Sequence, residues 1–171
     1  PHISKDTGYA ASTGAVDGQR IYSIFATGEL VVVDMKGKLV WKKQLPIPKL
    51  NYGYSSSLIV WEKYLIVQYD TEEEQILYAF NAVTGALIWQ QNRKSGVSWA
   101  SPVIMSADDK QIIVVVTSRA VETFDLTSGT PLWKNECMAG EVATSPAYAN
   151  GNILIASDNA SALALDLKTG R

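Results

Sequence analysis

Three tryptophans recur in this chain at a nearly constant spacing, and each follows a glycine by four residues. Trp89 comes 48 residues after Trp41, and Trp133 comes 44 residues after Trp89. Three segments carry the complete signal: Asp34–Trp41, Asn81–Trp89 and Asp125–Trp133. A fourth, Asp166–Arg171, matches as far as the glycine and reaches Arg171 before the position of a tryptophan. A period of roughly 40 to 50 residues is typical of proteins built from stacked repeats, so we predict a repeat protein.

Each repeat also divides into short strands. The first strand is expected to begin at a serine in every repeat, namely at Ser12, Ser56, Ser101 and Ser145. The second strand is the most apolar one, with the segments Ile21–Phe25, Tyr64–Val67, Ile112–Val116 and Ile153–Ala156. Such β-branched runs fit strands that are buried on both faces. Period and pattern together predict an all-β chain of just under four consecutive four-stranded antiparallel blades of a β-propeller, with approximate repeats 5–49, 50–94, 95–138 and 139–171.

The turns between strands carry their own signals. Asp17-Gly18 and Asn150-Gly151 are dipeptides that favour two-residue hairpins, whereas Glu62-Lys63 and Asp108-Asp109 at the same place predict turns of another type or length. Before the glycine turn, small residues stand two positions ahead of the Asp or Asn, at Val32, Ala79, Thr123 and Ala164. Large residues follow them, so the small ones share one strand face, against which we expect the tryptophan to lie.

The second repeat, Ala79-Phe-Asn81-Ala-Val-Thr84-Gly85-Ala-Leu-Ile-Trp89, resembles the tryptophan-docking repeat of the pyrroloquinoline-quinone (PQQ)-type β-propellers. In that family the motif docks each blade onto its neighbour, and the ring closes with seven or eight blades. The resemblance therefore implies a docking role for the tryptophans and turn glycines, which are Trp41, Trp89, Trp133, Gly37, Gly85, Gly129 and Gly170.

The spacing also suggests how much of a propeller is present. Counting back from Ser12 makes residues 1–4 the expected tail of an outermost strand, and the fourth repeat stops before its last strand. Repeats bury their faces mainly on neighbouring repeats, so an incomplete ring leaves faces bare. We therefore expect either a second copy of the chain or further blades to close the propeller.

Composition excludes several kinds of partner. The chain has 15 basic and 17 acidic residues, for a net charge of -2, with no basic stripe, which argues against nucleic acid. The longest apolar runs, such as Ile112–Val116, are too short to cross a bilayer as a helix. The chain opens on Pro1 without a visible signal peptide, and the lone Cys137 cannot form an internal disulfide.

No residue pattern predicts a catalytic or metal site. His2 is the only histidine, and Cys137 has no neighbouring base, so we interpret it as an inert thiol. Glu72–Glu74 lacks the ligand spacing of calcium loops. The recurring Asp34, Asp125 and Asp166 are interpreted as turn caps, because Asn81 takes the same position without a proton to give. Asn159-Ala-Ser161 matches a glycosylation pattern and nothing more.

Binding is the better-supported activity. Aromatic and amide side chains gather in the connections between successive blades, and the candidates for a binding face are Tyr9, Asn51, Tyr52, Tyr54 and Trp99. Such groups suit stacking on a peptide, a sugar or a flat ring. The alternative is that Tyr54 and Trp99 fill the gap between adjacent blades.

Two functions remain open at this point. The first is a non-enzymatic scaffold, periplasmic, cell-surface or secreted, that binds protein or polysaccharide without a cofactor. It resembles the propeller lipoprotein of the bacterial outer-membrane-protein assembly machinery. The second is a piece of a quinoprotein dehydrogenase that would use PQQ and calcium. The resemblance to those enzymes implies a vicinal cysteine pair and a Glu, Asn and Asp set, which this sequence does not provide, although they could lie on missing blades. We therefore favour the scaffold.

Overall fold

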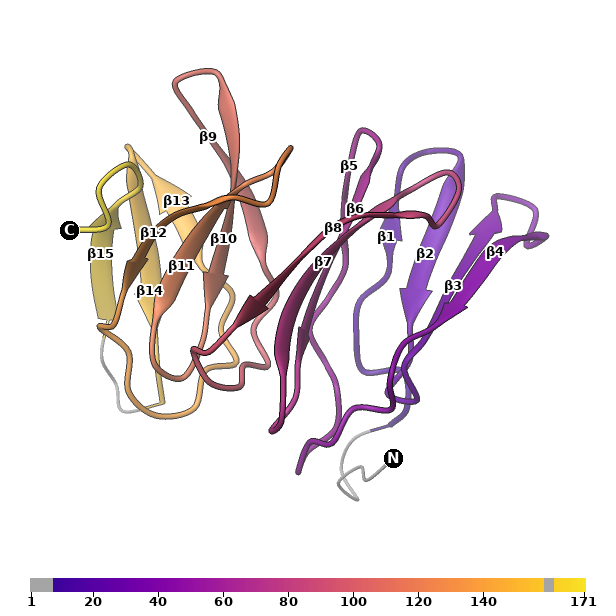
Figure 1. Cartoon of the computed structure of the whole chain (residues 1–171), viewed down its shortest axis with the longest axis horizontal. Helices are drawn as coiled ribbons and strands as arrows, with labels where there is room; N and C mark the ends of the chain where they lie inside the picture. Colours follow the sequence, from indigo (N-terminus) through magenta and orange to yellow (C-terminus); the bar gives the residue numbers. More distant parts are fainter. Residues whose placement is uncertain (1–7, 159–161) are drawn as a thin grey trace. The chain divides into compact units, whose positions relative to one another are not determined.

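The computed structural model describes residues 8–158 and 162–171, which form fifteen strands in four antiparallel sheets and contain no helix (Figure 1). The prediction of an all-β, blade-like chain is confirmed. His2, the expected strand tail at residues 1–4 and the glycosylation pattern at Asn159–Ser161 lie outside the described residues.

The chain divides into two compact units, Pro1–Arg93 and Lys94–Arg171. In the first unit, blade 1 consists of β1 (Ala15–Val16), β2 (Arg20–Ile24), β3 (Glu29–Asp34) and β4 (Leu39–Gln44). Blade 2 consists of β5 (Ile59–Trp61), β6 (Tyr64–Asp70), β7 (Gln75–Asn81) and β8 (Leu87–Arg93). In both sheets the strands pair in sequence order, so each blade is a meander.

The second unit repeats this order. Blade 3 consists of β9 (Val103–Ala107), β10 (Lys110–Val116), β11 (Val121–Asp125) and β12 (Pro131–Asn135). Blade 4 has three strands, β13 (Ala147–Ala149), β14 (Asn152–Ala156) and β15 (Ala162–Asp166). We call the edge strands β4, β8 and β12 the outer strands.

The first strand of each blade begins two or three residues after the serine at which we expected it. These serine segments connect neighbouring blades instead. The backbone N–H of Thr13 donates to Ser57 Oγ at 3.1 Å, and the backbone N–H of Ser101 donates to Ser145 Oγ at the same distance. A backbone that bonds to the next repeat in this way is not available to its own sheet.

Two turn predictions were wrong. Asp17-Gly18 is not itself the two-residue turn, because the backbone N–H of Asp17 donates to the Arg20 carbonyl at 3.2 Å and leaves Gly18 and Gln19 at the tip. Asp108 and Asp109 form a two-residue hairpin between Ala107 and Lys110 with φ values of 48° and 61°. Asn150-Gly151, with φ values of 51° and 82°, has the same left-handed character. A two-residue hairpin requires left-handed φ values, and Asp tolerates them better than most residues. Asp-Asp in place of Asn-Gly therefore leaves the turn at two residues.

Two tryptophans lie on the glycine turn of the following blade. A Cβ placed on Gly85 would lie 2.8 Å from Cδ2 of Trp41, and one on Gly170 would lie 2.6 Å from Cε3 of Trp133. The indole N–H of Trp41 donates to the Ala82 carbonyl at 3.1 Å, and that of Trp133 donates to the Leu167 carbonyl at 2.8 Å. Only glycine leaves room for an indole this close to the backbone.

Each tryptophan also has the expected small partner within its own sheet. Strand register pairs Val32 with Trp41, Ala79 with Trp89 and Thr123 with Trp133. Trp89 is half-buried, Gly129 is buried at φ 71°, and Gly37 is exposed at φ 81°. Among the described residues, no atom comes within 4 Å of a Cβ placed on Gly37.

The Asp or Asn before each glycine is a turn cap. The side-chain oxygen of Asn81 accepts hydrogen bonds from the backbone N–H groups of Val83 at 2.9 Å and Thr84 at 3.0 Å. Asp125 accepts the equivalent pair of bonds from Thr127 and Ser128. Because the oxygen is engaged by backbone amides, these side chains fix the turn on which the neighbouring indole rests.

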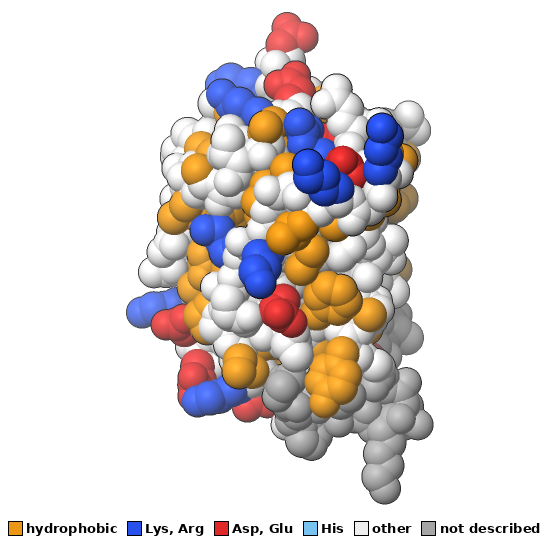
Figure 2. Space-filling view, turned by 90° about the vertical axis from the view of Figure 1, so that its right-hand side faces the viewer, with side chains coloured by type: hydrophobic (Ala, Val, Ile, Leu, Met, Phe, Trp, Pro, Cys, Tyr) orange, Lys and Arg blue, Asp and Glu red, His pale blue; other side chains and the backbone are white. Residues whose placement is uncertain are grey.

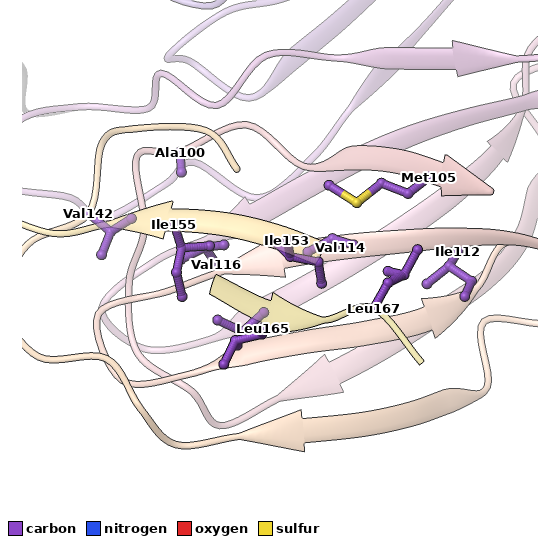
Figure 3. Packing of buried hydrophobic residues seen from close by; sticks show 11 residues of the cluster. Ala100, Met105, Ile112, Val114, Val116, Val142, Ile153, Ile155, Leu165 and Leu167 are labelled. Atoms are coloured by element: carbon purple, nitrogen blue, oxygen red, sulfur yellow. The ribbon is translucent and has the colours of Figure 1, made fainter. Parts of the chain in front are cut away.

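The core of the second unit lies between its two blades. Apolar side chains of blade 3 interdigitate with those of blade 4 and close the space between the sheets (Figure 3). The buried members are Ala100, Met105, Ile112, Val114, Val116, Val121, Val142, Ile153, Ile155, Leu165 and Leu167, and the half-buried Trp133 packs against them. Burial of apolar surface therefore supplies the main attraction between these blades.

The glycine turns permit a matched test of indole docking. Gly37→Ala meets only the backbone strain of a left-handed residue, about 1–2 kcal/mol. Gly85→Ala meets that strain and also displaces Trp41, which we expect to cost about 1–3 kcal/mol more. Denaturant unfolding of both variants measures the difference. Equal losses of stability would show that the indole does not rest on Gly85.

A second prediction concerns pH and the first hairpin. The Asp17 carboxylate accepts hydrogen bonds from the buried Tyr22 hydroxyl at 2.7 Å and from the Arg20 guanidinium at 2.9 Å. Burial alone would raise the pKa of Asp17, but these bonds and those from the Gln19 and Arg20 backbone lower it to about 2.

Because the folded pKa lies below the unfolded value of about 3.9, this stabilisation is complete above pH 4 and is lost as the pH falls toward 2. We expect Asp17→Asn to lower the free energy of unfolding by about 1–3 kcal/mol at neutral pH, with a difference that shrinks between pH 4 and 2. Urea unfolding at several pH values measures it. A difference that is constant with pH would contradict the assignment.

Candidate binding face

Two kinds of loop could form a binding face: the connections between successive blades, and the loops between the second and third strands of a blade. They meet at one end of the blade. In the first unit, the connection between blades 1 and 2 (residues 45–58) lies beside the loop between β6 and β7 (residues 71–74). The backbone N–H of Glu72 donates to the Lys49 carbonyl at 3.1 Å, and the Lys49 ammonium pairs with the Glu73 carboxylate at 2.6 Å. We call this end, formed by residues 45–58 and 71–74, the loop end of blade 2.

A small hollow of about 50 Å³ opens at the loop end of blade 2. Its lining residues are Pro46, Ile47, Lys49, Tyr69, Thr71, Glu73, Glu74, Ile76 and Tyr78. The Tyr69 hydroxyl donates to the Pro46 carbonyl at 2.6 Å, which fixes the connection against β6. The hollow thus combines an aromatic and aliphatic wall with a charged rim.

The structure separates the predicted binding residues into two groups. Tyr9 is 50% exposed and Tyr52 is 52% exposed, and Asn51 is also exposed. Tyr54, in contrast, is 2% exposed, and its hydroxyl donates to the Gln68 carbonyl at 2.9 Å. Tyr54 is therefore not part of an accessible face, and that prediction is corrected.

Packing explains why Tyr54 turns inward. Its ring lies 5.1 Å from the ring of Tyr69, which in turn lies 6.3 Å from Tyr78. Burial raises the pKa of Tyr54 well above its ordinary value, so the hydroxyl stays neutral and acts as a donor. The alternative interpretation from sequence, in which this tyrosine fills space beside a blade, describes its position.

Trp99 belongs to the second unit and is half-buried. Its backbone N–H donates to the Val142 carbonyl at 3.0 Å, which ties it to the connection that leads into blade 4. Trp99 is therefore only partly accessible. Each unit therefore contributes its own candidates, with Tyr9, Asn51 and Tyr52 in the first and Trp99 in the second.

The hollow and its most exposed apolar residue were not predicted from the sequence. Ile47 is 59% exposed, between Pro46 and Pro48. An isoleucine between two prolines in a connection is a usable signal, because proline holds the backbone extended and prevents a strand from covering the side chain. Tyr69 and Tyr78 could not be predicted to line a hollow, since they lie in strands whose pattern indicates core residues.

A buried ion pair fixes the loop end of blade 2 from beneath. Asp70 ends β6 and Arg93 ends β8, both opposite Gln75 in the register, and the guanidinium of Arg93 binds the carboxylate of Asp70. The side chains are 0% and 1% exposed, and Gln68 donates to the second carboxylate oxygen at 2.8 Å. This bridge joins two strands that do not pair directly and so limits how far they can separate.

Removing one partner of this pair leaves the other as a buried charge, which usually costs about 3–5 kcal/mol. We expect Arg93→Leu to lower the free energy of unfolding by that amount. Asp70→Leu in addition should recover much of the loss, because the buried carboxylate that lost its guanidinium partner is gone. A double-mutant cycle by denaturant unfolding measures the coupling. Additive losses would mean that the pair does not act as a unit.

The described residues offer little reactive chemistry. Within residues 8–158 and 162–171, no three His, Cys, Asp or Glu side chains are grouped so as to hold a metal ion. Burial raises the pKa of the Cys137 thiol, which makes it a poorer nucleophile. The same part of the chain includes no helix with the length and apolar character of a membrane-crossing segment.

Four-stranded meanders whose outer tryptophans rest on the next sheet define a β-propeller protein of the PQQ-like type. The family described as outer membrane protein assembly factor BamB matches residues 72–171, and the chain belongs to this family. No curated protein matches the chain.

Solved structures support the fold. BamB from Moraxella catarrhalis is 17% identical with a TM-score of 0.70, over 95% of this chain and 48% of that one. A europium-containing methanol dehydrogenase is 12% identical with a TM-score of 0.74, over 93% and 40%. The computationally designed Ika4 protein is 14% identical with a TM-score of 0.70, over 96% of both chains. The chain thus spans less than half of the first two structures.

The resemblance to quinoprotein dehydrogenases raises the question of a quinone cofactor. The hollow at the loop end of blade 2, of about 50 Å³, is far below the roughly 300–1,000 Å³ of pockets for small molecules. A larger hollow of about 330 Å³ beside Trp133 and Leu167 lies over the second unit. The sequence has one cysteine and therefore no vicinal pair, and the described residues group no ligands for calcium. The residues present do not fit PQQ and calcium, so we derive no chemistry from them.

Proposed function

We propose that the chain is part of a non-enzymatic β-propeller scaffold of the cell envelope that binds protein partners at its loop end. The hollow beside Ile47 carries this proposal. Its volume of about 50 Å³ suits the tip of one aliphatic side chain rather than a whole small molecule. Exposed Ile47 and Tyr52 extend the apolar surface along the same connection.

The charged rim favours an extended peptide. Lys49 and Glu73 stand at the hollow with exposed side chains and offer both a donor and an acceptor. An extended chain places alternate side chains on one side, so one aliphatic residue can enter the hollow while its neighbours contact the rim. This arrangement gives modest affinity and tolerance of sequence, which suit a scaffold with several partners.

The family supports the envelope location and the kind of partner. Its description, outer membrane protein assembly factor, concerns proteins whose membrane strands alternate apolar and polar residues. We therefore propose as ligand an extended segment with that alternation. Polysaccharide is the second candidate, since exposed Tyr52 beside Asn51 would suit stacking on a sugar.

Titration with labelled peptides tests the proposal. We expect an alternating apolar–polar peptide to bind, and Ile47→Asp to weaken binding by about tenfold to a hundredfold, because an aliphatic contact worth roughly 1.5–3 kcal/mol is lost. Fluorescence anisotropy measures the affinity. Ile88→Asp is the matched control, since Ile88 is exposed on β8 near the opposite end of the blade.

The other possible ligands are arms of the same experiment. Oligosaccharides and PQQ with calcium are titrated in parallel against the unmodified chain. Binding of the peptide that depends on Ile47 supports the proposal. Binding of the sugar alone, or a thermal shift with PQQ and calcium alone, would overturn it, and so would an equal effect of the two isoleucine variants.

A further inference from the structure

Negative charge gathers at the loop end of blade 2. The connection at residues 45–58 includes a single charged side chain, Lys49, whereas the loop at residues 71–74 includes Glu72, Glu73 and Glu74. All three glutamates are exposed. The side of the molecule on which β3 and β4 lie differs, since Figure 2 shows Lys and Arg side chains among Asp and Glu side chains there. The loop end of blade 2 is therefore a locally acidic surface.

Lys49 compensates only one of these charges. Its ammonium lies 2.6 Å from the Glu73 carboxylate, and both side chains are exposed. Glu74, which lines the hollow beside them, forms no ion pair within residues 8–158 and 162–171. The charge of Glu74 is therefore available to a ligand that enters the hollow.

Backbone hydrogen bonds fix Glu74 at the edge of the hollow. The backbone N–H of Thr71 donates to the Glu74 carbonyl at 2.7 Å, and the Thr71 hydroxyl donates to the same carbonyl at 2.9 Å. The backbone N–H of Glu74 donates to Thr71 Oγ1 at 2.9 Å. The backbone that carries the carboxylate is thus held in place before a ligand arrives, which lowers the cost of binding.

Tyr78 adds a second polar group to the same hollow. The residue is 8% exposed and lines the wall. The hydroxyls of Tyr54 and Tyr69 donate to carbonyls at 2.9 Å and 2.6 Å, but that of Tyr78 has no hydrogen-bond partner in the described part of the chain. Burial raises the pKa of Tyr78, and the charge of Glu74 raises it further, so the hydroxyl is neutral and can donate or accept.

A ligand that fills the hollow removes water from both groups. A buried hydroxyl without a hydrogen bond is costly, and a buried carboxylate without a partner is more costly. A neutral ligand residue leaves the charge of Glu74 uncompensated, and an acidic one adds repulsion. A positively charged residue with N–H donors satisfies the carboxylate and the hydroxyl oxygen together. The chemistry of this wall therefore favours lysine or arginine beside the aliphatic residue.

We propose that the loop end of blade 2 selects extended segments in which a lysine or arginine flanks the aliphatic residue that enters the hollow. The ammonium or guanidinium donates to the Glu74 carboxylate and to the Tyr78 hydroxyl oxygen. The long aliphatic stem of such a side chain can cover apolar surface while its charged end reaches a polar group, and Ile76 of the lining offers that surface. This selectivity rests on the function proposed above, because it concerns the same hollow.

Four labelled peptides test the selectivity by fluorescence anisotropy with the 171-residue chain. Three share the same aliphatic positions and carry lysine, serine or glutamate at the polar positions. We expect the lysine peptide to bind about tenfold more tightly than the serine peptide, and the glutamate peptide to bind more weakly than both. The fourth peptide keeps the lysines but has serine in place of the aliphatic residues, and it should bind poorly because it cannot fill the hollow.

Two variants remove the polar groups one at a time. Glu74→Gln keeps the size of the side chain and should remove most of the preference for lysine, with little effect on the serine peptide. Tyr78→Phe keeps the ring and should remove part of the preference. Glu62→Gln is the matched control, since Glu62 is exposed in the turn between β5 and β6, at the other end of β6. Circular dichroism checks folding, and Glu74→Ser replaces Glu74→Gln if that variant does not fold.

The outcomes separate this selectivity from the proposed function. Equal binding of the lysine, serine and glutamate peptides that is lost in Ile47→Ser would keep the proposed function and overturn the selectivity. Absence of binding by all peptides would overturn both. The selectivity is also wrong if the lysine peptide without aliphatic residues binds as tightly as the one with them, or if Glu74→Gln and Glu62→Gln have the same effect, because the attraction would then come from the net charge of the chain.

Discussion

The structure depends on the packing of an indole against a glycine turn. Trp41 on Gly85 and Trp133 on Gly170 each combine ring contact with a hydrogen bond from the indole N–H to a turn carbonyl. The Asp or Asn of each glycine turn fixes that turn, because its side-chain oxygen accepts hydrogen bonds from two backbone N–H groups. This combination sets where one sheet lies on the next, and the apolar strands then bury their faces in the space that it defines.

Much of this could be predicted from the sequence, because the signals are local and repeated. The apolar runs, the glycine turns and the family all follow from residues within one repeat. For Tyr54 the sequence left two interpretations open, a binding residue or a packing residue, because the choice depends on contacts with Tyr69 and Gln68 in β6. The hollow beside Ile47 was missed for the same reason, since its walls come from a connection and from two strands.

The loop end of blade 2 shows how a sheet can hold exposed apolar side chains in fixed positions. Asp70 and Arg93 join two strands beneath the surface, and the Tyr69 hydroxyl holds the connection at Pro46. Exposed Ile47 and Tyr52 are thereby placed on a fixed support rather than on a free loop. A surface of this kind suits binding through shape and apolar contact, which is the role that we propose for it.

The α protons of the turn glycines provide the most direct measurement of the central interaction. An indole stacked on a glycine shields those protons, so NMR should show upfield shifts at Gly85 and Gly170 and none at Gly37. The shift at Gly85 should disappear in Trp41→Ala and the shift at Gly170 in Trp133→Ala, each without effect on the other. Three glycines with the same α-proton shifts, or shifts that survive loss of the tryptophan, would contradict the account.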